Sequence, residues 1–131
     1  MAELENNSLN QLKWSLQALA LPADQQVQLF PSFVWVGDEL ALDFYERRES
    51  ALKEHHFTLS QLSALTELEA VLSKMGAETN MDLWEEGAAL SRYPQWQEVR
   101  ERAHQALEQF GWSLEVPPKN RGVIYVGPPE E

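Results

Sequence analysis

The segment from Thr58 to Gly76 constrains the fold more than any other part of the chain. Thr58 with Gln61 three residues later is typical of a capping box at the start of a helix. Gly76 stands at the position where helices commonly stop. The pattern predicts a helix over Leu59–Met75, with one apolar stripe made by Leu62, Leu65, Leu68, Leu72 and Met75.

A second helix is predicted from Ser8 to Leu21 and ends at Pro22. One apolar stripe of this helix consists of Leu9, Leu12, Leu16 and Leu19. A second stripe, on a different side, consists of Trp14, Ala18 and Leu21. A helix that is apolar on two sides is usually sandwiched in a core, and the alternative is that it offers one side to a partner.

Three further helical segments are predicted. Asp24–Leu29 adds a short turn of helix, and Asn80 caps a short helix over Met81–Leu90. Pro94 suits the first position of a helix that runs to Phe110, because proline gives up an amide that would be unpaired there. Gly111 ends this helix.

Two β-hairpins are expected. In the first, the β-branched and aromatic run Phe33–Val36 leads through a turn at Gly37-Asp38 into Glu39–Phe44, where Leu40, Leu42 and Phe44 point inward. The competing interpretation is a helix that begins near Asp38, because Leu40 and Phe44 are four residues apart. Tyr45–His56 then forms a helix or an exposed connection.

The second expected hairpin pairs Trp112–Val116 with Val123–Val126 across a proline-containing turn. The predicted fold class is therefore α+β, with about four helices packed on a short antiparallel sheet made of the two hairpins. A single globular domain is expected over residues 1–131, because this length is usual for one domain and 44% of the residues are hydrophobic. Residues 127–131 are expected to be a frayed tail.

The charge balance bears on the partners of the protein. The chain has 21 Asp and Glu residues against 10 Lys and Arg, a net charge of −11. This balance disfavours nucleic acids and anionic membranes, and it favours a basic protein partner or simply high solubility. The absence of cysteine, of a signal sequence and of a long apolar run leads us to expect a cytoplasmic protein without disulfides.

The titratable residues form no recognisable catalytic or metal-binding motif. His55 and His56 are adjacent and therefore point in different directions, and no metal-ligand spacing accompanies them. Adjacent carboxylates are ordinary surface charges unless the two groups face a cleft and lie in different environments. We therefore expect no catalytic residue, no metal and no cofactor.

Trp84 is the aromatic residue that invites a functional interpretation. It is flanked by carboxylates, as in a site for a basic protein surface, although a tryptophan under a short helix can also fill the core. The leading hypothesis is a non-enzymatic acidic binding protein, for example a bacterial immunity or antitoxin protein that blocks a basic toxin such as a nuclease. An accessory subunit that docks through an apolar helix face and an enzyme of an unrecognised class are the alternatives. The expected partner-binding residues are Asp38, Glu39, Asp43, Trp84, Glu85 and Glu86.

Overall fold

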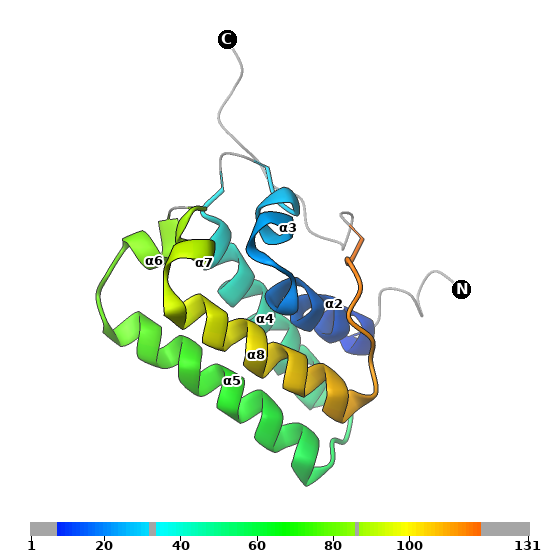
Figure 1. The fold of residues 1–131 in the computed structure, drawn as a ribbon. Helices are drawn as coiled ribbons and strands as arrows, with labels where there is room; N and C mark the ends of the chain where they lie inside the picture. The colour runs from blue at the N-terminus through cyan, green and yellow to red at the C-terminus, as the bar shows by residue number, and fades with distance from the viewer. Residues whose placement is uncertain (1–7, 32–33, 86, 119–131) are drawn as a thin grey trace.

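Four long helices, accompanied by three short ones, build the described part of the protein, a computed structural model in which residues 8–31, 34–85 and 87–118 are described. The long helices are α2 (Ser8–Ala20), α4 (Val36–Glu54), α5 (Leu59–Ala77) and α8 (Pro94–Phe110). The short helices are α3 (Ala23–Gln28), α6 (Asp82–Glu85) and α7 (Ala89–Arg92). Figure 1 shows α5 and α8 side by side, with α3, α6 and α7 gathered at one end of the long helices.

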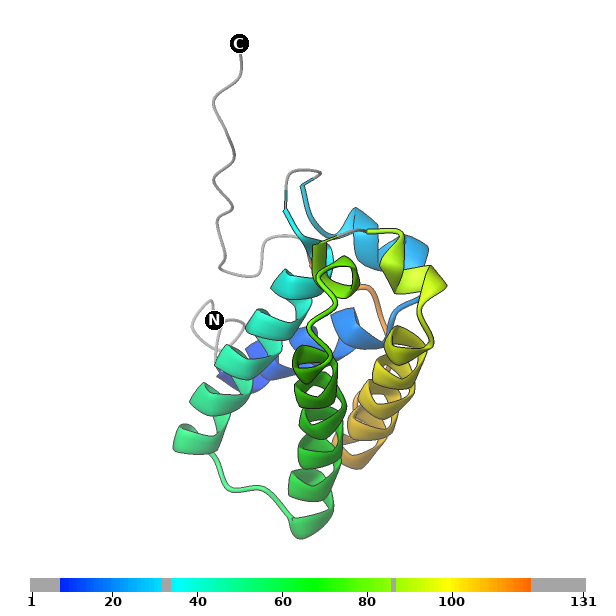
Figure 2. The ribbon, with the colours of Figure 1, turned by 90° about the vertical axis from the view of Figure 1, so that its left-hand side faces the viewer.

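Helices α2 and α8 connect the long helices. Helix α2 contacts both α4 and α8, while α5 packs along α8. Figure 2 shows α4, α5 and α8 extending away from the short helices, with α2 lying across them. Both apolar stripes of α2 contribute to the core, so docking a partner through this helix would require exposing core side chains.

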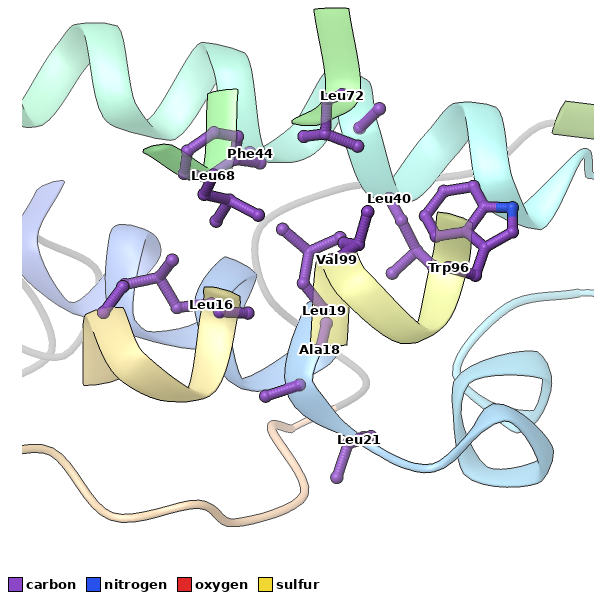
Figure 3. Close-up of a cluster of buried hydrophobic side chains, with 14 of the residues drawn as sticks. Leu16, Ala18, Leu19, Leu21, Leu40, Phe44, Leu68, Leu72, Trp96 and Val99 are labelled. Atoms are coloured by element: carbon purple, nitrogen blue, oxygen red, sulfur yellow. The ribbon is translucent and has the colours of Figure 1, made fainter. Parts of the chain in front are cut away.

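The core is continuous between the long helices. Figure 3 shows Phe44 and Leu40 from α4 near Leu68 and Leu72 from α5, with Leu16 and Leu19 from α2 on another side. All six side chains are almost completely buried. The core draws apolar stripes from each of the long helices, which explains why the leucine-rich sequence patterns were informative.

The predicted ends of the long helices are largely confirmed. The Thr58 hydroxyl accepts a hydrogen bond from the Gln61 amide, and the Gln61 side chain accepts one from the Thr58 amide. Pro94 begins α8, and Gly111 ends it in the left-handed conformation with φ of 70°. The predicted helix stop at Gly76 is wrong, because α5 continues through this residue to Ala77.

The prediction of the first hairpin is wrong. Residues Val36–Glu54 form the single helix α4, which includes the predicted turn and second strand and the Tyr45–His56 segment up to Glu54. The competing helical interpretation was the correct one, although the helix begins two residues earlier than Asp38. The physical reason is that Val36, Leu40, Phe44 and Ala51 share one buried side of a helix, whereas a strand would have directed Leu42 inward with them.

The second expected hairpin is also absent from the residues that the structure describes. Trp112–Val116 has no strand partner there, and its proposed partner Val123–Val126 lies outside the described residues, as does the expected tail at 127–131. The Ser113 carbonyl instead accepts a hydrogen bond from the Gln17 side chain at 2.9 Å, and the Trp112 ring stacks on Phe110. The described residues therefore contain no sheet, and the α+β fold class is corrected to an all-helical one.

The short helix predicted over Met81–Leu90 is divided. Asn80 does accept a hydrogen bond from the Asp82 amide through its side chain, at 3.1 Å, as expected of a residue at a helix start. Helix α6 nevertheless ends at Glu85, and α7 covers only Ala89–Arg92. This arrangement places Trp84 next to the N-terminal end of α4, since α4 contacts α6.

Candidate functional site

An open apolar groove lies between α4 and α5 and is closed at one end by residues around α6. We call it the α4–α5 groove. Its volume is about 390 Å³, towards the lower end of the range of about 300–1,000 Å³ that is usual for small-molecule pockets. It is lined by Trp35, Asp38, Ala41, Leu42, Tyr45, Leu72, Ser73, Gly76, Met81 and Trp84.

Three large apolar side chains of the groove are exposed to solvent. The exposed fractions are 51% for Trp35, 46% for Leu42 and 56% for Met81. Leu42 is exposed because it is two residues from both Leu40 and Phe44, which places it on the opposite side of α4 from the core. Scattered apolar residues are normal on a surface, but three that line one groove form a patch suited to binding.

The wall of the groove at α6 is held by two tryptophans. Trp84 is half-buried and packs edge-on against Trp96, with ring centroids 5.6 Å apart and an interplanar angle of 79°. The Trp96 indole nitrogen donates a hydrogen bond to the Leu83 carbonyl at 2.8 Å, so its polar atom is satisfied in the core. These contacts fix the position of Trp84 and keep one side of it in the groove.

Few polar groups line the groove. Asp38 is the only charged residue among the lining residues. The hydroxyls of Tyr45 and Ser73 lie 3.4 Å apart, across the boundary between α4 and α5. The groove therefore offers mostly apolar surface, with a carboxylate at one position.

Carboxylates line the side of α4 next to Leu42. Glu39 precedes Leu42 by three residues and Glu46 follows it by four, so all three lie on one side of the helix. We call Asp38, Glu39 and Glu46 the acidic edge. Burial raises the pKa of Glu39, and the negative charges of Asp38, Asp43 and Glu46 raise it further. These carboxylates are therefore close enough to Glu39 to repel its negative charge.

The structure brings together some of the residues predicted to bind a partner. Asp38 and Trp84 both line the groove, and Glu39 belongs to the acidic edge. Asp43 forms an ion pair with Arg47 at 3.1 Å, so part of its charge is already neutralised within α4. Glu85 is the last residue of α6 and does not line the groove, and Glu86 lies outside the described residues.

Sequence reasoning missed most of the apolar lining of the groove. Leu42 was expected to point inward from a strand, and Trp35 was included in the first strand of the same hairpin. Met81 was treated only as the start of a short helix. The available signal was Leu42 itself, because a helix with its core stripe at Leu40 and Phe44 must direct Leu42 away from the core.

The histidines lie elsewhere. The His55 Nε2 atom is 3.0 Å from the Ser8 hydroxyl, which connects the end of α4 to the start of α2. His56 is exposed, and His104 lies 3.3 Å from a Glu108 carboxylate oxygen on the surface of α8. Across the described ranges, no group of three or more His, Asp or Glu residues is arranged to hold a metal ion.

Two further observations concern the class of protein. Among the described residues, no helix combines the length and apolarity needed to cross a lipid bilayer. Comparison with protein-family models, with curated proteins and with solved structures gives no match to this chain. Function must therefore be argued from the groove and its surroundings alone.

Proposed function

We propose that this protein binds a basic partner protein through the α4–α5 groove and the acidic edge. The observation that supports this proposal is the position of three exposed apolar side chains, Trp35, Leu42 and Met81, beside Glu39 and the other carboxylates of the edge. A few buried residues carry most of the binding energy at protein interfaces, and tryptophan is enriched among them. Carboxylates at the rim select Arg and Lys on the partner.

The charge of the whole chain supports the same type of partner. A net charge of −11 attracts a cationic protein over a distance comparable to the Debye length, and this raises the association rate. An acidic protein of this kind can cover the cationic active site of an enzyme that acts on phosphates. The specific form of our proposal is a cytoplasmic, non-enzymatic inhibitor of a basic toxin, such as a nuclease, in the manner of a bacterial immunity or antitoxin protein.

The test compares how well the wild-type protein and a variant with a neutralised acidic edge capture the partner. The tagged wild-type protein and the triple variant Asp38→Asn, Glu39→Gln, Glu46→Gln are incubated with lysate of the source cells, at low and at high salt. The matched control carries Glu98→Gln, Glu101→Gln and Glu108→Gln, three exposed carboxylates on α8. All three proteins are first shown to have the same circular dichroism spectrum.

We expect the wild-type protein and the α8 control to retain a basic protein at low salt, and the triple variant to lose it. High salt should weaken the retention, because rim charges are screened by salt. The captured protein is then assayed for nuclease or other toxic activity with and without the acidic protein. Equal retention of every captured protein by the wild type and the triple variant would rule out the acidic edge as the binding surface.

A further inference from the structure

We infer that the α4–α5 groove receives a basic amphipathic helix of the partner, with apolar side chains in the groove and Arg or Lys side chains against the acidic edge. This inference rests on the proposed function and specifies the element that the partner presents. It follows from three properties of the groove: the scarcity of hydrogen-bonding groups, the size, and the spacing of the carboxylates.

The scarcity of hydrogen-bonding groups favours a helical ligand. An extended peptide needs partners for its backbone N–H and C=O groups, and such peptides usually pair with the edge of a sheet. The described residues contain no strand, and the lining side chains that carry a carboxylate or a hydroxyl are Asp38, Tyr45 and Ser73. A helix satisfies its own backbone groups and needs only a surface for its side chains.

The size of the groove fits the side chains of a helix and not its backbone. A volume of about 390 Å³ holds a small number of large side chains. Residues three and four apart on a helix lie on one side, so two or three apolar side chains of the partner can enter the groove together. They would contact Leu42, Met81 and Trp35, which are the large apolar lining residues left exposed in the free protein.

The spacing of the carboxylates places the basic residues of the partner. Glu39 and Glu46 are seven residues apart, which corresponds to about 10 Å along the axis of α4. Two basic residues separated by about two turns of the partner helix would face them when that helix lies along α4. Burial and mutual repulsion already raise the pKa of Glu39, and a cation placed there would relieve that repulsion.

The same charges argue against a second copy of this chain as the occupant. Two copies joined through the groove would bring two acidic edges together, each on a chain with a net charge of −11. Like charges opposed across an interface repel one another, at a cost in affinity. A cationic helix of another protein removes this cost.

The experiment is a selection of peptides from a display library of helix-forming sequences with randomised side chains. Selection uses the whole wild-type protein and is repeated with Gly76→Phe, which introduces a large side chain into the groove. Gly76 lines the groove, and no atom beyond its neighbours and the nearby backbone of α5 lies within 4 Å of the position that a Cβ would occupy there. We therefore expect the variant to block the groove without displacing the core.

We expect the wild type to enrich peptides with apolar residues three or four apart and Arg or Lys on the adjoining side. Their affinity should fall by about tenfold or more on Gly76→Phe, and also on the double variant Leu42→Ser, Met81→Ser. The matched control is Leu59→Ser at the start of α5, where an equally apolar side chain is 85% exposed outside the groove. Binding to that control should equal binding to the wild type.

Enrichment of neutral or acidic peptides, absence of any enriched peptide, or equal binding to the wild type and Gly76→Phe would each overturn the inference. Retention of the captured partner by each variant distinguishes a failure of helix docking from a failure of the proposed function. A basic partner that is lost by the acidic-edge variant but retained by Gly76→Phe supports the function and contradicts docking in the groove. A partner retained by both variants contradicts both proposals.

Discussion

Gly37 allows α4 to approach α6 and α8 closely. A methyl group at its Cβ position would lie 2.8 Å from Trp96 Cζ2 and 2.9 Å from the Leu83 carbonyl oxygen. The residue was interpreted from sequence as part of a turn, but its role is to be small inside a helix. Trp96 is fully buried and cannot move away without disturbing the core.

We therefore expect Gly37→Ala to lower the free energy of unfolding by about 1–3 kcal/mol, the usual cost of overpacking a core. Urea denaturation of the variant and the wild type measures the difference. Gly76→Ala is the matched control, because that position is open and lies within α5. The free energy of unfolding of the control should rise by about 0.5–1 kcal/mol, since alanine favours a helix more than glycine does. A Gly37→Ala variant as stable as the wild type would show that α4 has room to move.

The raised pKa of Glu39 predicts a pH-dependent effect on stability. A carboxyl whose pKa is higher in the folded state stabilises the fold when it is protonated, below its unfolded value of about 4.5. This contribution is lost as the pH rises through the raised folded value. Stability of the wild type should therefore fall in this range relative to a variant that cannot ionise.

Comparison of Glu39→Gln with the wild type at several pH values measures this effect. The variant should gain stability relative to the wild type as the pH rises from below 4.5 to neutral. Glu101→Gln, at an exposed position on α8, controls for the loss of one carboxylate. A stability difference for Glu39→Gln that does not change with pH would contradict the repulsion described above.

At the scale of the elements, Gln26 connects α2, α3 and α8. Its buried side chain donates hydrogen bonds to the carbonyls of Ala18 and Leu19, both at 3.0 Å. Carbonyls in the last turn of a helix have no partner within the helix, so this glutamine caps the end of α2 from another element. Arg100 donates a hydrogen bond to the Gln26 side-chain oxygen at 3.3 Å and to the Leu90 carbonyl at 2.8 Å. Burial lowers the pKa of Arg100.

Replacement of Gln26 by alanine should lower the free energy of unfolding by about 1–3 kcal/mol, because buried carbonyls and a guanidinium group lose a hydrogen-bonding partner. The neighbouring Gln25→Ala, at an exposed position, should change it by less than about 0.5 kcal/mol. Chemical denaturation of both variants tests the difference. Similar free energies of unfolding for the two variants would mean that water replaces the hydrogen bonds of the Gln26 side chain without loss of stability.

At the scale of the whole molecule, stability depends on α2. Leu12, Leu16 and Leu19 are completely buried, and the helix contacts both α4 and α8. Deletion of residues 1–21 would expose the sides of both helices to water. We expect the truncated chain to lose cooperative thermal unfolding, followed by circular dichroism.

The milder variant Leu16→Ala should fold, and its free energy of unfolding should be lower by about 2–5 kcal/mol, the range for a leucine replaced by alanine in a packed core. A truncated chain that still unfolds cooperatively would show that the rest of the protein folds without α2. It would thereby favour the alternative of an accessory subunit that binds through this helix.

The sequence alone determined the positions where most long helices begin and end. Thr58 with Gln61, Pro94 and Gly111 act through hydrogen bonds and backbone angles within a few residues of themselves. Such local interactions are the same in any fold, which is why α5 and α8 were predicted closely. Asp38 and Trp84, two of the expected partner-binding residues, do line the groove, although Asp38 was expected in the turn of a hairpin that does not exist.

Only the tertiary structure decided whether residues 36–44 form a helix or a hairpin. Val36, Leu40 and Phe44 are compatible with both, because their local preferences and spacing do not distinguish the two. Burial of these side chains by helices distant in sequence selects the helix, and this selection turns Leu42 outward beside Glu39. The α4–α5 groove depends on that packing, since its walls come from α4, α5 and α6, which meet only in the folded chain.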